Sequence, residues 1–230
     1  MAFPSPDAFN TSITDTAGTS HTLNLPTGIA SGDLLMVFFD YAVISNTITF
    51  PGGWTTLTTA SIENAVGSTE GLATAYRIAS GSEGSSITVT TSVSTRANHQ
   101  SIRITAHDSS TAPEAVAGTV NNATPDPPAL TPTGGAQDYL WIAVGARSRA
   151  STTADLSAAP TNYSNLTTSA NSGTGSAFST GGIAKRQLNA SSEDPGTFTS
   201  TDTTAESCDA TIAVYPMRGL PRLTLLGVGI

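Results

Sequence analysis

The stretch that decides the fold is Gly32-Asp33-Leu34-Leu35-Met36-Val37-Phe38-Phe39. A near-continuous apolar run of this kind is typical of a β-strand that is covered on both faces. Two further landmarks follow it, a turn at Pro51-Gly52-Gly53-Trp54 and the segment Ala75-Tyr76-Arg77-Ile78-Ala79-Ser80-Gly81-Ser82-Glu83-Gly84. Because proline and glycine mark turns, the pattern predicts strands joined by tight connections.

The same landmarks recur in the same order in the second half of the chain. They read Gln137-Asp138-Tyr139-Leu140-Trp141-Ile142-Ala143-Val144, then Pro160-Thr161-Asn162-Tyr163, then Ala184-Lys185-Arg186-Gln187-Leu188-Asn189-Ala190-Ser191-Ser192-Glu193. The offset is roughly 105 to 110 residues, and it aligns Leu34–Phe39 with Tyr139–Val144. Each copy closes on a strand-like run, at Ser101-Ile102-Arg103-Ile104 and at Ala210-Thr211-Ile212-Ala213-Val214. The sequence therefore predicts one β unit present twice.

The composition favours strands over helices. More than a quarter of the 230 residues are Ser or Thr, only 11% are charged, and Lys185 is the one lysine. Surface helices depend on Lys, Glu, Arg and Leu, whereas Thr and Val suit a pleated surface. We therefore expect an all-β fold, a duplicated antiparallel β-sandwich that is jelly-roll-like or Ig-like, with pseudo-twofold halves and almost no helix.

The expected strands come at the short spacing of a sandwich or jelly roll. In the first copy they span residues 8–14, 19–25, 33–41, 55–61, 71–79, 86–91 and 100–107; in the second they span 114–120, 129–131, 138–146, 163–168, 179–188, 196–200 and 209–215. The domain boundaries that follow are 1–110 for the first repeat, 111–216 for the second and 217–230 for an apolar C-terminal tail. Two separate domains and one large sandwich are both open at this point.

Charge and cysteine content narrow the partners. The net charge of -8 disfavours nucleic acid, because phosphate binding needs clustered Lys and Arg. No apolar run approaches the length of a membrane span, and the first residues lack the basic and apolar regions of a signal peptide. Cys208 is the only cysteine, so no disulfide can form within the chain.

Two pairs of charged residues occupy matching places in the repeats, Arg77 with Glu83 and Arg186 with Glu193. They could form polar ligand sites, but we favour a bridge between a strand and its following turn in each copy. Trp54 and Tyr163, each after a proline turn, could stack on sugar rings, although we expect them to close the ends of the core.

No residue pattern points to catalysis, a cofactor or a metal. His21, His99 and His107 lack the spacing of metal ligands, and no Gly-x-Ser-x-Gly elbow surrounds a serine. Cys208 is expected to be a small buried residue rather than a nucleophile. The chain is therefore predicted to be non-enzymatic, with no cofactor and no metal.

The last residues carry the strongest indication of a partner. Met217 to Ile230 have no counterpart in the first copy, and their large apolar side chains would be unusual on a free surface. The proposed partner-contact residues are Leu220, Leu223, Leu225, Leu226, Val228 and Ile230. The segment Leu223-Thr224-Leu225 alternates, so it could add a strand to a sheet edge of a neighbouring subunit or fold back on its own repeat.

The three landmarks of the first copy together resemble a loosely defined group of β-rich proteins of tailed bacteriophages and prophages. This resemblance covers about a hundred residues and is fainter in the second copy. It implies a structural protein of the virion, with capsid decoration and a tail or fibre component both open. We take capsid decoration as the leading expectation, and the lack of a signal peptide predicts folding in the host cytoplasm. Other virion proteins or copies of itself would be its partners. A carbohydrate-binding or adhesion module that recognises a host glycan is the competing class.

Overall fold

The computed structural model describes residues 2–43, 45–63, 69–121, 124–149, 156–171, 178–201 and 205–218, with Arg149 and Phe178 described by their backbone alone. These residues form strands, turns and irregular segments and no helix, which confirms the expected all-β class. No described segment is therefore a helix able to cross a membrane. The strands are β1 (Ser5–Asn24), β2 (Leu34–Tyr41), β3 (Ile48–Thr49), β4 (Thr55–Glu63), β5 (Thr69–Ile78), β6 (Ser86–Thr105), β7 (Glu114–Val120), β8 (Gln137–Arg149), β9 (Leu156–Ala158), β10 (Ser164–Ala170), β11 (Phe178–Ala190), β12 (Thr199–Ser200) and β13 (Ser207–Val214).

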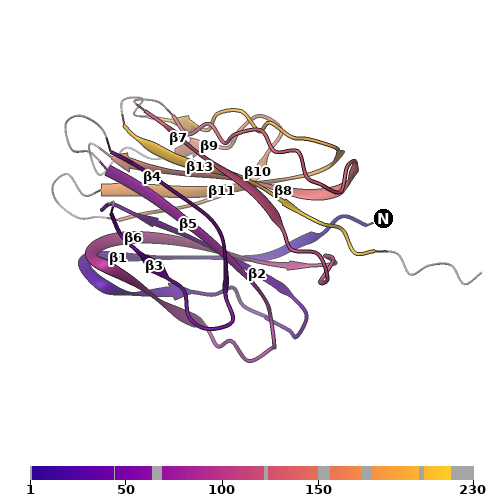
Figure 1. The fold of residues 1–230 in the computed structure, drawn as a ribbon, viewed down its shortest axis with the longest axis horizontal. Coiled ribbons are helices and arrows are strands. Elements are labelled where there is room, and N and C mark those ends of the chain that lie inside the picture. Colours follow the sequence, from indigo (N-terminus) through magenta and orange to yellow (C-terminus); the bar gives the residue numbers. More distant parts are fainter. Residues whose placement is uncertain are drawn as a thin grey trace, which may run out of the picture.

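Two antiparallel sheets, one from each repeat, pack face to face (Figure 1). The first sheet has the order β1-β6-β2-β5-β4, with β3 paired to β6, and the second has the order β7-β13-β8-β11-β10. Read in this direction, the two orders match strand for strand, since the first strand of each repeat pairs with its last strand. The predicted duplication is thus present in the topology, and the duplicated halves form one large sandwich.

The contacts between the sheets follow a pseudo-twofold axis. Edge strand β4 of the first sheet lies against edge strand β7 of the second, and the equivalent pair β1 and β10 lies together on the other side. The inner pairs β5 with β8 and β11 with β2 are equivalent in the same way. Each contact between a strand of repeat one and a strand of repeat two is therefore matched by a contact between the equivalent strands with the repeats exchanged, as in an isologous dimer.

The strand ladders correct the expected alignment of the repeats by one residue. Leu35 pairs with Arg77 on β5, and Trp141 pairs with Arg186 on β11, so Leu35 corresponds to Trp141. Leu34 then corresponds to Leu140 rather than to Tyr139, and both face the space between the sheets. The sequence alignment went wrong because β8 begins before Asp138 whereas β2 begins after Asp33, so equating the two aspartates shifts every side chain to the opposite face.

The turns before Trp54 and Tyr163 are equivalent as expected. The amide of Trp54 donates to the carbonyl of Pro51 at 3.3 Å, and the amide of Tyr163 donates to that of Pro160 at 3.0 Å. The residue before each aromatic side chain has a positive φ, 85° at Gly53 and 70° at Asn162. Glycine and asparagine tolerate this conformation best, which explains their presence at the two positions.

A central core fills the space between the sheets, and both sheets also bury their outer faces. Each sheet therefore has apolar side chains on both sides, which is why Leu34–Phe39 reads as a continuous apolar run. The buried central core consists of Leu34, Met36, Phe38, Leu72, Ile102, Ile104, Leu140, Ile142, Val144, Ala146, Ile183, Cys208, Ala210, Ile212 and Val214. All eight residues of β2 are buried.

The first outer face is covered because β1 and β6 bend back over their own sheet. Both strands are 20 residues long, and register shifts at Thr14, Gly18 and Ser20 mark the bend that is visible at the left of Figure 1. Beyond the bend, Leu23 and Val89 pack on Leu35, forming the first outer core. Bulges of this kind let a strand turn a corner and continue in a second layer.

The second outer face is covered by shorter pieces. The segment 124–130 runs along residues 193–198, where Leu130 exchanges two backbone hydrogen bonds with Glu193 and Phe198 donates to Pro125. Strands β9 and β12 pair over the same face. Beneath them lies the second outer core, which includes Tyr139, Trp141, Tyr163 and Phe198.

Candidate functional site

The two matching charge pairs are present as ion pairs in both repeats. The Arg77 Nε lies 3.3 Å from Glu83 Oε1, and the Arg186 Nη1 lies 2.7 Å from Glu193 Oε1. Each pair joins the end of a strand, β5 or β11, to the turn that follows it. The geometry agrees with the strand-to-turn bridge favoured from the sequence.

Glu83 is also a structural cap for its turn. Its carboxylate accepts from the Ser80 amide at 2.6 Å, the Ser80 hydroxyl at 2.7 Å and the Gly81 amide at 3.0 Å. Burial opposes ionisation, but these hydrogen bonds outweigh it and lower the pKa of Glu83 to about 2. Because the carboxylate accepts this many hydrogen bonds from within the turn, its role is to stabilise the loop.

Trp54 and Tyr163 belong to the cores. Tyr163 is buried in the second outer core, and Trp54 is half-buried against the first. Both rings therefore pack against the outer cores, and the buried Tyr163 ring is not available as a sugar platform.

Two of the three histidines, His21 and His99, pack against Phe39 inside the first repeat. His99 stacks on Phe39 with ring centroids 5.2 Å apart, and His21 meets the same ring edge-on at 5.1 Å. Burial, followed by the neighbouring His21, lowers the pKa of His99 to about 3, so the ring is neutral. No three His, Cys, Asp or Glu side chains among the described residues are grouped to hold a metal ion.

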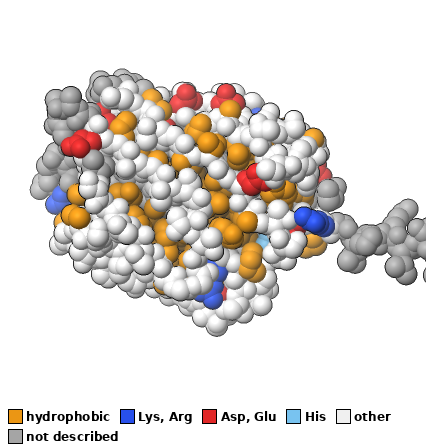
Figure 2. Space-filling model, in the orientation of Figure 1, with side chains coloured by type: hydrophobic (Ala, Val, Ile, Leu, Met, Phe, Trp, Pro, Cys, Tyr) orange, Lys and Arg blue, Asp and Glu red, His pale blue; other side chains and the backbone are white. Residues whose placement is uncertain are grey.

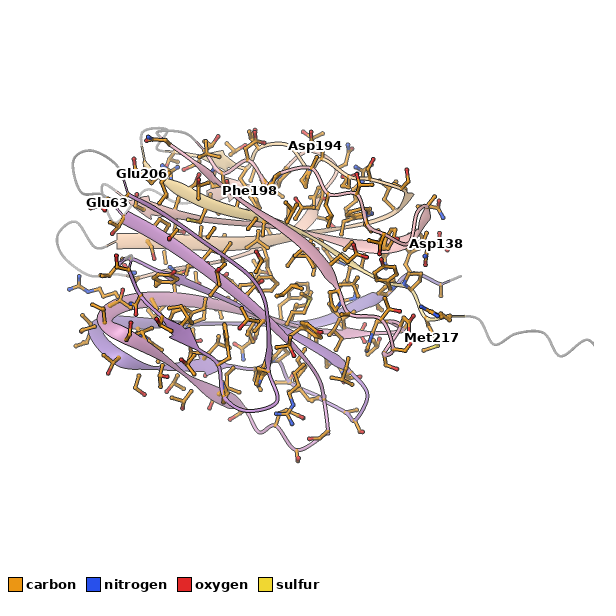
Figure 3. All side chains as sticks on the ribbon, in the orientation of Figure 1. Glu63, Asp138, Asp194, Phe198, Glu206 and Met217 are labelled. Carbon is orange, nitrogen blue, oxygen red and sulfur yellow. The ribbon has the colours of Figure 1, made fainter. Side chains whose placement is uncertain are left out.

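One end of the central core is polar, a feature that was not anticipated from the sequence. Six buried polar residues meet there from both sheets, and we call them the inter-sheet polar cluster: Asp40, Glu70, Asn98, Gln100, Ser169 and Ser179. Glu70 pairs with Ile62 next to Glu63, which Figure 3 labels at this end, whereas Asp138 and Met217 lie at the other end. The cluster therefore sits where the apolar inner face of β2 runs out.

Hydrogen bonds of the cluster join the two repeats. The Gln100 Nε2 lies 3.0 Å from Asp40 Oδ2 and 3.1 Å from Asn98 Oδ1 within the first sheet. It also lies 2.7 Å from Ser169 Oγ, which belongs to the second sheet. The Asn98 Nδ2 donates to the Ser179 hydroxyl of the second sheet at 2.6 Å. Ser169 in turn donates to Asn98 Oδ1 or to the His99 carbonyl, each at 3.2 Å.

Two carboxyl groups of the cluster are held in their neutral form. Burial raises the pKa of Asp40 to about 8, against a smaller opposing effect of the Gln100 hydrogen bond. Burial also raises the pKa of Glu70 well above its usual value, with Asp40 adding to the shift and Arg147 opposing it. The buried Cys208 thiol donates to the Glu70 carbonyl, and burial raises its pKa too, so it is not an activated nucleophile.

The cluster could have been predicted from the alternation of inward-facing and outward-facing side chains along β2 and β6. On β2 the residues that face the central core are Leu34, Met36 and Phe38, and the next in the series is Asp40. On β6 the series Ile104 and Ile102 continues to Gln100. Following the period of two beyond the apolar run would have placed both polar residues inside.

A second notable place is the end of the last strand, from which the C-terminal tail departs. The Met217 amide donates to the Ala106 carbonyl at 3.2 Å, and His107 and Pro216 form a β-bridge between the ends of the two repeats. The Arg218 Nε lies 2.6 Å from Asp108 Oδ2. A cavity of about 220 Å³ opens beside this point, lined by Tyr76, Ile78 and the 107–113 segment among others.

The six proposed partner-contact residues of the tail, Leu220, Leu223, Leu225, Leu226, Val228 and Ile230, lie outside the described residues. The attachment point at Met217 and Arg218 is described, and more than half of the Met217 side chain is exposed.

A groove with a volume of about 530 Å³ lies between β1, the 25–29 loop and the 81–85 turn. Its lining residues are Asn10, Asn24, Leu25, Pro26, Thr27, Gly28, Ile29, Gly81, Glu83, Gly84 and Ser85. Among these described lining residues there is no aromatic ring.

The surface around these places carries little charge. Figure 2 shows most of one face as uncharged atoms, with acidic and basic side chains in small separate spots.

Comparisons with protein-family models, with curated proteins and with solved structures found no match.

Proposed function

We propose that this chain is a non-enzymatic structural protein of a bacteriophage particle, and that it decorates the capsid surface. The proposal takes up the resemblance of the landmark Gly32–Phe38, the turn at Pro51 and the segment Tyr76–Gly84 to virion-associated proteins. A tail or fibre component is the alternative location within the same class.

The observation that carries the proposal is the fixed departure point of the apolar tail. Backbone pairing of Met217 with Ala106 and of Pro216 with His107 ties the chain to the body immediately before the tail begins. Asp108 adds a charged contact to Arg218, which counts for less because the arginine is largely exposed. An apolar peptide that starts from a fixed point on a closed body is suited to docking on a neighbouring subunit.

The closed body is the second support. Both faces of each sheet are buried, and the cores supply cohesion without a disulfide, since Cys208 is free and buried. A closed body whose sequence ends in an apolar segment suits a decoration protein better than a ligand carrier.

The test is a chain that ends after Arg218. We expect this truncated protein to fold with nearly unchanged Tm and to be absent from purified particles, where mass spectrometry should detect the full chain. As a matched control, Met217→Ala in the full chain should still be incorporated. Normal incorporation of the truncated chain would contradict the proposal, and so would its failure to fold.

The polar groove beside Asn10 and Asn24 favours a second candidate, a module that binds a host glycan. The Asn24 side-chain oxygen could accept a hydrogen bond from a sugar hydroxyl, whereas the Asn10 amide already bonds to Leu25 and Thr11. The described lining offers no ring for stacking. Strong binding on a glycan array by the full chain, lost in Asn24→Ala and combined with absence from particles, would reverse the ranking of the two candidates.

A further inference from the structure

We propose that the inter-sheet polar cluster is a proton-dependent lock between the two repeats, closed while Asp40 carries a proton and loosened when that proton is lost. The lock does not depend on the biological role proposed above. It follows from the placement of a carboxyl group in the interface that holds the two halves together.

The hydrogen-bond inventory of the cluster has too many acceptors. A carboxamide nitrogen has two hydrogens, yet the Gln100 nitrogen faces oxygens of Asp40, Asn98 and Ser169. The Asp40 Oδ1 and the Gln100 Oε1 are both buried, and neither has a hydrogen-bond partner among the described residues. A proton on Asp40 supplies one of the missing donors, whereas a negative charge adds further unmet demand.

The space around Asp40 leaves the charged form no relief. Its carboxyl rests against Gly181 of the opposite sheet, where even a methyl group would overlap with it. Among the described residues, the titratable groups that act on one another at this end of the interface are Glu70 of β5, Cys208 of β13 and Tyr41 of β2. Arg147 of β8 also acts on Glu70, and Asp209 acts on Cys208. The remaining members are the neutral side chains Asn98, Gln100, Ser169 and Ser179, with Ser148 on β8.

An ionised Asp40 would therefore sit between the sheets beside a second carboxyl group, with one hydrogen-bond donor. The least costly response is for the sheets to part at this end and admit water. Because the apolar part of the central core lies toward the other end of β2, the opening would be local rather than complete.

Cys208 is a natural probe for this opening, since it is the only cysteine and is fully buried in the same interface. The experiment measures the rate at which an aromatic disulfide reagent labels Cys208 between pH 6 and pH 9, relative to an unstructured cysteine peptide. The ratio removes the effect of pH on thiolate formation itself. We expect the relative rate to rise at least about tenfold between pH 6 and pH 9, with most of the rise below pH 8 and a plateau above it, as Asp40 loses its proton.

The decisive variant is Asp40→Asn, which keeps the shape of the side chain and cannot ionise. In this variant the relative labelling rate should stay low across the pH range. Asp209→Asn is the matched control, because Asp209 is equally buried but lies on the opposite face of β13, and it should open as the wild type does. Equal protection of wild-type Cys208 at pH 6 and pH 9 would overturn the lock, and so would identical opening in Asp40→Asn.

A second measurement tests the proposal on the unmodified chain and does not require any variant to fold. The carboxyl carbon resonance of Asp40 in the folded protein should titrate near pH 8, in line with the effect of burial on its pKa. A titration near pH 4, as in an exposed aspartate, would show that water already reaches the group and that no lock exists.

Discussion

At the scale of single residues, a close contact between the two sheets depends on a glycine. Gly181 on β11 faces Asp40 on β2, and a Cβ built on the glycine would overlap the carboxylate and crowd Asn98. No side chain other than hydrogen fits at this place while the carboxyl group remains. The two sheets therefore pack tightly at this polar end of the interface.

Gly181→Ala should destabilise the protein by about 1–3 kcal/mol or more, because overpacking at the interface forces the sheets apart. The free energy of unfolding can be measured by urea denaturation. Gly52→Ala is the matched control, since no atom lies within 4 Å of the position a Cβ would take there. Combining Gly181→Ala with Asp40→Ala should recover part of the loss, and strictly additive effects would contradict the contact.

Glu83 should give the protein an acid-sensitive contribution to stability. Hydrogen bonds lower its pKa from 4.5 to about 2 in the folded state, so the folded protein binds fewer protons than the unfolded chain in this range. This contribution to the free energy of unfolding is therefore fully present at pH values above the pKa of Glu83 in the unfolded chain, and it disappears as the pH falls toward 2.

Glu83→Gln should cost about 2 kcal/mol at pH 7 and almost nothing near pH 2, as judged from urea denaturation at a series of pH values. The exposed Glu63 provides the control, and Glu63→Gln should change stability by less than about 0.5 kcal/mol. A loss for Glu83→Gln that is the same at every pH would show that the carboxylate charge is not what holds the turn.

At the scale of the elements, the structurally equivalent central strands of the two sheets, β2 and β8, stabilise the protein. Each is covered on both faces, so Leu35 packs into the first outer core while Ile142 packs into the central core. Leu35→Ala and Ile142→Ala should each cost roughly 2–5 kcal/mol, the range for deleting a fully buried aliphatic side chain. A loss below 1 kcal/mol at either site, measured by thermal or urea denaturation, would mean that the strand is not doubly covered.

Most of the strands could be predicted because they carry a period of two or a continuous apolar run between turn residues. The segment 114–120 was predicted with its boundaries, and β2 began one residue later than expected. The predictions failed where long-range geometry decides. β1 and β6 were each predicted as two strands, because the residues at the bend are polar and their sequence is typical of a loop.

The short strands β3 and β9 were missed, and the expected strand at 129–131 is only a bridge at Leu130. β3 and β9 each pair over two residues, and Leu130 over one, with a segment far away in the sequence, so the local pattern gives no signal. The inter-sheet polar cluster was missed for a related reason. A polar residue such as Gln100 is expected outside, and only the packing of a second sheet makes its position interior.

At the scale of the whole molecule, each repeat supplies half of the central core. The first sheet contributes Leu34, Met36, Phe38, Leu72, Ile102 and Ile104 to it. A chain of residues 1–110 alone would expose this apolar face, which is far more than a soluble monomer tolerates. We expect such a fragment to form dimers or aggregates, as detected by light scattering. A stable monomer would show that the two halves are independent domains.

The matching strand order of the two repeats has a consequence for dilute solutions. Two separate copies of such a unit would associate only above some concentration, and they would part when diluted. Joined by one connection, the partners are always present at a high effective concentration. The halves no longer have to be identical either, so one can keep its long folded-over strands while the other carries the C-terminal extension. The chain behaves as a dimer that dilution cannot dissociate and whose two members have become free to diverge.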